Sequence, residues 1–346
     1  MNSPVKLSID LLPEFGWRIN GEPVYSPGSI FEGSVKVDTT TNIPQATIKI
    51  LFVGTEKLRP DVAAISGVML EQRPIFAVRS ILFGKEGPQD IPTGEQQYHF
   101  AIQLPMVNYP PTFVHSMCSC SFRLIAVLES DSTKRMYSEQ SIRYIPYIET
   151  SPLKDTYTLT AHGSSISVPS LSYLQSDTIP IHYESKNSPV TSVTVKLRRR
   201  LSYGDDGVED HLDETLASEE IKLTNTNTLN GTVYFNLPES IVPTIDYSSW
   251  MSMTYSLEVH IRRQKLIGTA AHFMVPLTIG TMGPGIRTPS DLKPYNQSKE
   301  DEAGRRVVPC FVQRIEYEDC LPEYASYKLP NYQNSSSCEW AEPSTA

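Results

Sequence analysis

The sequence predicts an all-β protein made of two tandem β-sandwich domains and a flexible C-terminal tail. Apolar and polar residues alternate in short segments throughout the first 280 residues, which is the pattern of half-buried strands. The alternation stops near Pro146 and Pro152 and then restarts. After Gly280 the chain becomes polar and rich in Pro, Ser and Asn, a composition that favours disorder.

The first domain is predicted to span residues 1–145. A turn at Ser26-Pro27-Gly28 precedes the first clear strand, in which Gly33 marks a place where the strand bends or bulges. The pair Pro110-Pro111 forces an extended connection before the most apolar strand. The strands expected in this domain cover residues 31–37, 47–53, 98–104 and 121–128.

The second domain is predicted to span residues 155–280, with the tail at 281–346. In segment 193–198 the odd-numbered residues are apolar and the even-numbered ones polar, and segment 253–262 behaves in the same way. One face of each strand is therefore expected to meet a core and the other water. The strands expected in this domain cover residues 166–168, 178–183, 190–201, 231–237, 251–262 and 270–277.

Charge and targeting signals exclude several classes of function. The net charge is −9 over 346 residues, whereas a nucleic-acid-binding domain is expected to carry a basic stripe. We find no signal peptide and no apolar run long enough to span a bilayer. Five irregularly spaced cysteines do not form a disulfide framework. We therefore expect a cytoplasmic protein that does not bind nucleic acid.

Two charged features of the second half have alternative interpretations. The acidic stretch 204–220 is either a solvated hairpin loop or a charged contact surface. Two basic clusters are either solvated sheet faces or contacts for phosphorylated cargo tails or anionic lipid. The clusters consist of Arg198, Arg199 and Arg200, and of Arg262, Arg263 and Lys265.

We find no constellation that predicts catalysis, a metal or a cofactor. His115, Cys118 and Cys120 are close in sequence but offer three ligands, whereas structural zinc sites use four at familiar spacings. These residues are expected to pack in a core or loop. No GxSxG, HExxH, GxGxxG or P-loop motif is present at a suitable position. An enzyme is therefore the least favoured class of function.

Several segments in order resemble the arrestin family. Residues 24–37 (VYSPGSIFEGSVKV) are similar to its opening turn and strand, and residues 48–56 end in a similar "G-x-E". Residues 100–128 resemble its "F-x-x-x-L-P … P-P-S-F … Y-x-x-A-x-L" stretch. Residues 173–183 and 275–280 resemble the opening and the closing "V-P-L-x-I-G" of its second domain, with Ser176 where the family often has Gly. The resemblance implies two immunoglobulin-like sandwiches that form an arrestin fold.

Two features suggest the branch of the family. The buried acid–base cluster that joins the domains of visual-type arrestins is not recognisable in this sequence. The short tail instead carries tyrosine motifs. Both features resemble the α-arrestins, the arrestin-domain-containing trafficking adaptors, in which phosphate sensing is not general.

Two L-P-x-Y motifs lie in the predicted tail, and WW domains bind such segments. The motif binds as an extended polyproline II helix. Its proline packs into an aromatic slot of the WW domain, and its tyrosine fills a second pocket. Two such motifs eight residues apart in one polar tail are more than chance predicts. The similar triplet Pro23-Val24-Tyr25 lies in a predicted strand region and is not counted as a motif. The residues predicted to bind are Leu321, Pro322 and Tyr324, and Leu329, Pro330 and Tyr332.

The resemblance implies a non-catalytic adaptor and names its partners. These are a HECT-type ubiquitin ligase with WW domains and the cytosolic tails of membrane proteins, with peripheral contact to the plasma membrane or endosomes. The alternative is a coat or scaffold subunit of the same fold, similar to the arrestin-like subunit of retromer, in which the tail motifs are incidental. A coat subunit would function without the two tyrosines.

Overall fold

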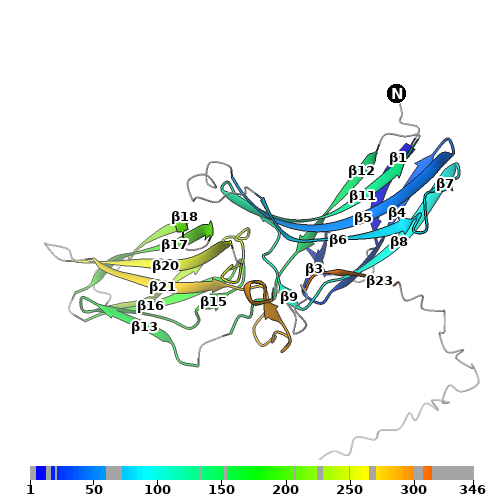
Figure 1. The fold of residues 1–346 in the computed structure, drawn as a ribbon. Helices are drawn as coiled ribbons and strands as arrows, with labels where there is room; N and C mark the ends of the chain where they lie inside the picture. The colour runs from blue at the N-terminus through cyan, green and yellow to red at the C-terminus, as the bar shows by residue number, and fades with distance from the viewer. Residues whose placement is uncertain are drawn as a thin grey trace, which may run out of the picture. The chain divides into compact units, whose positions relative to one another are not determined.

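The computed structural model describes residues 5–12, 17–19, 22–59, 72–131, 135–151, 154–186, 188–205, 208–223, 229–248, 250–264, 270–298 and 307–313. These residues are almost entirely β-structure, and the all-β prediction is confirmed. Residues 1–313 form one compact unit, which ends before residue 314. The strands of residues 1–313 form two sandwiches, one of β1–β8, β10–β12 and β23 (Cys310–Val312) and one of β13–β21 (Figure 1).

The first sandwich packs a four-stranded sheet against a larger sheet. The four-stranded sheet has the order β1-β4-β8-β23, and the larger one has the path β2-β3-β12-β11-β5-β6, with β10 on β11 and β7 on β5. The bounds are β1 Val5–Leu11, β2 Trp17–Ile19, β3 Glu22–Tyr25, β4 Ile30–Thr39, β5 Ile43–Leu58, β6 Gln72–Phe83, β7 Gln89–Ile91, β8 Gly94–Gln103, β10 Phe113–Val114, β11 Cys118–Ser130 and β12 Met136–Tyr144. A short two-stranded sheet adds β9 Val107–Asn108 and β22 Lys293–Pro294.

Two positions of the first sandwich require glycine for different structural reasons. Gly28 has a φ of +75° in the turn where the Ser29 amide donates to the Ser26 carbonyl, which matches the predicted turn. The register of β4 with β1 and β8 is continuous at Gly33, so the strand has no bulge there. Instead a Cβ at Gly33 would lie 2.6 Å from both the Asp10 carbonyl oxygen and the Phe100 ring. Gly33 is therefore required for close packing.

Gly33→Ala is expected to lower the free energy of unfolding by about 1–3 kcal/mol, because either the ring or the backbone of β1 must move. Urea denaturation of the full chain measures this loss. Gly283→Ala is the matched control, since its nearest neighbour would be the Ile286 side chain at 3.7 Å. A control change larger than about 0.5 kcal/mol, or a neutral Gly33→Ala, would contradict the packing argument.

The second sandwich contains a four-stranded and a five-stranded sheet. Their orders are β13-β14-β16-β19 and β15-β21-β20-β17-β18. The alternation predicted for residues 193–198 and 253–262 is observed, because Val193, Leu197 and Leu257 are fully buried. The bounds are β13 Tyr157–Ala161, β14 Ser164–Val168, β15 Ser172–Tyr173, β16 Thr178–Ser185, β17 Val190–Asp205, β18 Val208–Lys222, β19 Asn230–Asn236, β20 Met251–Arg263 and β21 Ala271–Ile279.

The acidic stretch 204–220 is a strand, so the solvated-loop interpretation is wrong for most of it. β18 begins at Val208 and pairs antiparallel with β17 as far as Lys222. Two of its carboxylates lie opposite arginines of β17, Asp213 opposite Arg200 and Glu214 opposite Arg199. Opposite charges across a strand pair stabilise the ladder, so the acidic composition supports this strand.

Ser176 occupies the position at which the resembling family often has glycine. Its φ is +65°, in the left-handed region that glycine enters without strain. The turn around it is held by the Leu174 amide, which donates to Asp177 Oδ2 at 2.7 Å. Ser176 therefore adopts a conformation that glycine would adopt without strain.

The segment after Gly280 does not begin as a flexible tail, which corrects the boundary expected at residue 281. The Thr281 amide donates to the Ile148 carbonyl, and the Lys293 amide donates to the Met106 carbonyl. The segment then adds β23, Cys310–Val312, as an edge strand on β8 of the first sandwich. The polar composition does not predict this docking, because β22 and β23 pair through backbone groups, which every residue carries.

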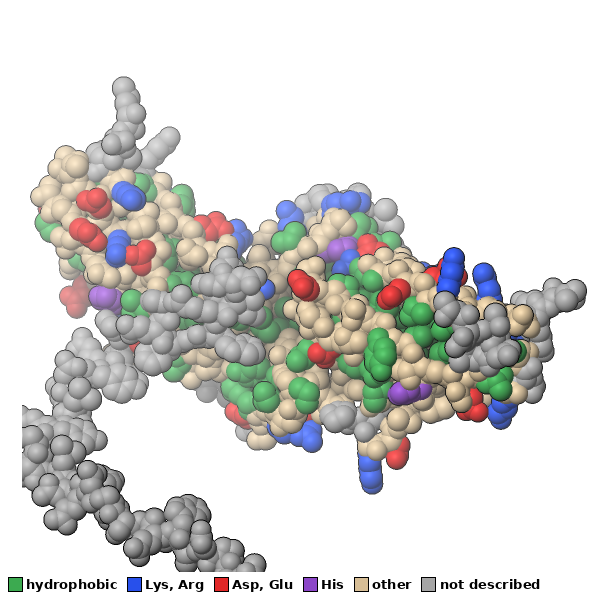
Figure 2. Space-filling view, turned by 180° about the vertical axis from the view of Figure 1, so that it is seen from behind, with side chains coloured by type: hydrophobic (Ala, Val, Ile, Leu, Met, Phe, Trp, Pro, Cys, Tyr) green, Lys and Arg blue, Asp and Glu red, His purple; other side chains and the backbone are tan. Residues whose placement is uncertain are grey.

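Lys, Arg, Asp and Glu side chains are interspersed over the face of the described surface that Figure 2 shows. No continuous basic stripe is visible on that face. Among the residues that the structure describes, none forms a helix with the length and apolar character needed to span a bilayer.

Candidate functional site

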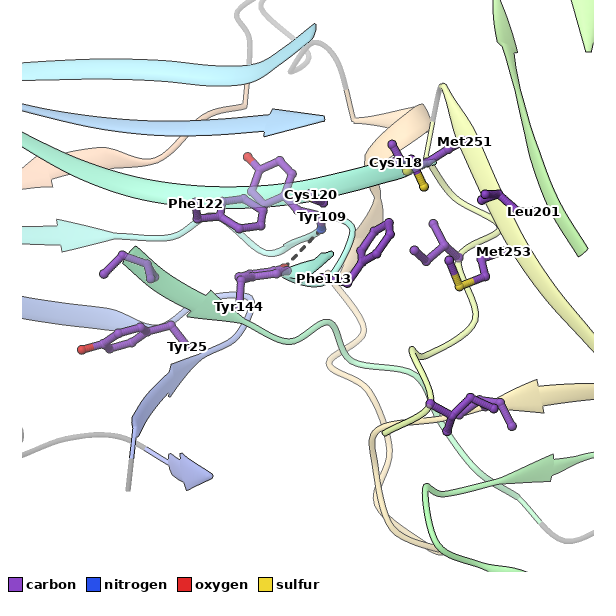
Figure 3. Packing of buried hydrophobic residues seen from close by; sticks show 14 of the residues in the cluster. Tyr25, Tyr109, Phe113, Cys118, Cys120, Phe122, Tyr144, Leu201, Met251 and Met253 are labelled. Atoms are coloured by element: carbon purple, nitrogen blue, oxygen red, sulfur yellow. Dashed lines mark hydrogen bonds between the residues drawn. The ribbon is translucent and has the colours of Figure 1, made fainter. Parts of the chain in front are cut away.

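The junction of the two sandwiches has an apolar part. Figure 3 shows Phe113 and Cys118 of the first sandwich facing Leu201, Met251 and Met253 of the second. All five side chains are buried, and they belong to one continuous hydrophobic cluster. Burial of this apolar surface favours association of the two sandwiches.

A tyrosine pair connects the first sandwich to the C-terminal segment. The Tyr144 hydroxyl donates to the Val107 carbonyl at 2.8 Å and accepts from the Tyr109 amide at 3.2 Å (Figure 3). The Tyr109 hydroxyl donates to the Val307 carbonyl, and its ring packs against that of Tyr295. The Tyr109 hydroxyl, in a ring positioned by Tyr144, thus holds the segment that leads to β23.

A polar cluster lies beside the apolar contact. His115 stands in the tight loop between β10 and β11, where its amide donates to the Cys118 carbonyl. His115 Nε2 lies 2.8 Å from an Arg199 nitrogen and 3.4 Å from Glu214 Oε2. Arg199 Nε donates to Glu214 Oε2 at 3.0 Å. The first sandwich therefore contributes the imidazole, and the second contributes an ion pair across β17 and β18.

Burial and charge set the protonation of this cluster. Burial, followed by the charge of Arg199, lowers the pKa of His115. The Met117 amide also points at Nδ1, so protonation would place positive groups against each other, and the ring is neutral. Burial alone would raise the pKa of Glu214, but the hydrogen bond and charge of Arg199 outweigh it and the pKa is lowered. At neutral pH the cluster holds one cation and one anion.

Glu56 forms a second polar connection across the junction. It lies near the end of β5, fully buried, and its Oε1 accepts from the Ser248 hydroxyl of the second sandwich at 2.5 Å. Its Oε2 has no hydrogen-bond partner among the described residues. Burial raises the pKa of Glu56 to about 7, against the effects of Ser248 and of the Arg73 charge.

No acid–base cluster between the domains is recognisable in the sequence, but the structure brings His115, Arg199 and Glu214 together there. His115 and Arg199 are 84 positions apart, and Glu56 and Ser248 are 192 apart, so no local spacing reveals either contact. A weak signal was present, because Glu56 ends the "G-x-E" strand of the family resemblance and Arg199 faces acidic residues across a hairpin.

The two predicted basic clusters are not brought together. Arg198 lies opposite Ser256, whereas Arg262 lies opposite Ser192, six positions away along β17 (198 − 192), which is about 20 Å. Arg200 makes a two-pronged contact with Asp213, and Arg198 donates to Thr215. Arg263 is buried and donates to the His162 carbonyl, while Arg262 is exposed. Most of these side chains thus have protein partners, and Lys265 lies outside the described residues.

The cysteines near His115 are part of the core. Cys118 and Cys120 are buried free thiols. Burial raises the pKa of Cys118 to about 12 and that of Cys120 well above its usual value. Both stay protonated, so neither offers the thiolate that acts as nucleophile or metal ligand.

The L-P-x-Y residues Leu321, Pro322, Tyr324, Leu329, Pro330 and Tyr332 lie outside the described part of the chain. The triplet Pro23-Val24-Tyr25 lies in β3, and Tyr25 is 2% exposed. A WW domain could not reach Tyr25 without unfolding that strand.

Comparison with known families agrees with this architecture. The profile described as Arrestin (or S-antigen), N-terminal domain, matches residues 13–150. The profile described as Arrestin (or S-antigen), C-terminal domain, matches residues 164–284. No curated protein matches the chain significantly. The two matches coincide with the two sandwiches and follow each other in the family's order, and the chain therefore belongs to the arrestin family.

Proposed function

We propose that the chain is a non-catalytic adaptor of the α-arrestin type, which links membrane-protein cargo to a WW-domain HECT-type ubiquitin ligase. Arrestin-fold domains are consistent with an adaptor in trafficking or signalling. The observation that carries the finer proposal is the pair of L-P-x-Y motifs in the sequence after the folded unit. In this proposal the protein moves from the cytoplasm to the plasma membrane or endosomes, where cargo and ligase share one scaffold.

The anchoring of β23 supports a tethering role. Leu321 comes nine positions after Val312, the last residue of β23 (321 − 312). Because β23 pairs with β8, the last strand before the motifs in the sequence is an edge strand of the first sandwich. A ligase bound there would be held close to cargo on the sandwiches.

The spacing of the motifs suits a tandem WW pair. The two leucines are eight positions apart (329 − 321), which corresponds to roughly 25 Å of extended polyproline II chain. Binding of one motif raises the effective concentration of the other, and avidity exceeds either single affinity by roughly 10²-fold or more.

Loss of both tyrosines is expected to abolish binding of the full chain to a tandem WW protein, measured by calorimetry. Tyr324→Ala or Tyr332→Ala alone is expected to weaken binding roughly 10²-fold, because each variant loses avidity. The full chain is required because residues 281–313 belong to the folded unit. Tyr234→Ala, which removes a 62% exposed tyrosine from β19, is the matched control.

A double variant that still binds as tightly as the unaltered chain would refute the use of these motifs. Absence of binding by the unaltered chain would remove the ligase from the proposal and leave an arrestin-fold scaffold or coat subunit, with partners to be sought on the sandwiches.

A further inference from the structure

Two histidines and a glutamate gather on the outer face of the five-stranded sheet. Glu258 and His260 are two positions apart on β20 and therefore lie on the same face. His272 of β21 is the direct cross-strand partner of His260. The junction and the predicted tail motifs use none of the three residues.

The ligand atoms converge on one point. His260 Nε2 lies 2.7 Å from Glu258 Oε1, and His272 Nε2 lies 3.2 Å from the same oxygen. The ligand atoms of all three side chains fit within 4.8 Å of one another. Zinc–nitrogen and zinc–oxygen bonds of about 2.0–2.2 Å in a tetrahedron place neighbouring ligand atoms roughly 3.3 Å apart. Small side-chain rotations would therefore admit an ion.

The sheet holds this arrangement before any ion binds. The imidazole rings of His260 and His272 are stacked, with centroids 4.6 Å apart and an interplanar angle of 22°. Both strands are paired in continuous register from Ile261 to Tyr255, and sites on such elements are positioned more precisely than sites on loops. Glu258 is 15% exposed and His272 50% exposed, so an ion can reach the site from solvent.

We propose that Glu258, His260 and His272 bind one divalent transition-metal ion of the zinc class, with water in the fourth position. Two imidazoles and one carboxylate form the donor set that zinc accepts, whereas magnesium and calcium select oxygen ligands. Lys196 lies directly opposite Glu258 on β17, and its positive charge opposes the ion. The site is therefore weaker than the donor set alone would make it.

Zinc titration of the full chain, without an affinity tag and with Cys310, Cys320 and Cys338 replaced by serine, tests the site. The serine background removes competing thiolates. We expect one ion per chain and a rise in Tm with added zinc. Loss of an outer-shell partner lowers metal affinity roughly 10–100-fold. Because His260 and His272 would bind the ion directly, we expect His260→Gln and His272→Gln each to lower zinc affinity by more than this. Lys196→Ala is expected to tighten binding.

His182→Gln is the matched control, because His182 is an exposed histidine of the other sheet, bonded to Thr232. Its affinity for zinc is expected to equal that of the unaltered chain. Cobalt provides a second readout, since a tetrahedral nitrogen and oxygen site gives intense visible bands that His272→Gln should abolish. Absence of zinc binding, or binding that neither histidine variant weakens, would overturn the proposal, and so would equal binding of magnesium.

Discussion

Arg199→Ala is expected to lower the free energy of unfolding by about 3 kcal/mol. Arg199 is 12% exposed and contacts Glu214 and His115. Removal of one member of a buried ion pair costs about 3–5 kcal/mol because the partner's charge stays uncompensated, and partial exposure of Glu214, at 28%, places this case at the lower end. The loss falls on both β17–β18 pairing and the junction with the first sandwich.

Arg200→Ala separates this effect from loss of a surface charge. Arg200 is the next residue of the strand and is bound to Asp213, but it is 57% exposed, so its loss is expected to cost less than about 1 kcal/mol. Chemical denaturation of the full chain measures both changes. The double variant Arg199→Met/Glu214→Leu is expected to regain most of the stability, because no buried charge remains unpaired. Equal costs for Arg199→Ala and Arg200→Ala would contradict a buried role for Arg199.

The sequence predicted the sandwiches well because burial of one strand face requires apolar and polar residues to alternate along the strand. The alternation in segment 193–198 arises because Val193, Val195 and Leu197 face the core of the second sandwich. The same reasoning located β20, whose inward residues include Met253 and Ile261. A period of two can be read from a few neighbouring residues.

The parts that were missed depend on contacts between distant residues. The acidic composition of β18 predicts a solvated loop. The segment is a strand because its partner strand carries arginines at matching register positions. Residues 281–298 and 307–313 have little periodicity, and the sequence therefore predicts a tail there, but they dock through backbone groups such as the Lys293 amide. The zinc-type cluster needs the register of β20 and β21, which pairs His260 with His272, and no local motif specifies a register.

Glu56→Gln is expected to make the stability of the protein less dependent on pH. The pKa of Glu56 is about 7 in the folded chain against 4.5 for an ordinary glutamate. Between those values the unfolded chain has released the proton and the folded chain retains it, so stability falls as pH rises from about 4.5 to 7 and the loss persists above 7. At about 1.4 kcal/mol per pH unit, the difference of 2.5 units (7 − 4.5) amounts to about 3 kcal/mol.

Glutamine removes this penalty but adds a buried N–H without an acceptor, which costs about 1 kcal/mol. The variant is therefore expected to be about 2 kcal/mol more stable than the unaltered chain at pH 8 and slightly less stable at pH 4, so that the two stability curves cross. Urea denaturation across this pH range measures the crossing. Glu139→Gln, which alters a 48% exposed glutamate on β12, is expected to change stability by less than about 0.5 kcal/mol. Parallel curves for Glu56→Gln and the unaltered chain would show that Glu56 is already ionised in the folded protein, and the carboxylate would then have to be held by Arg73 and Ser248.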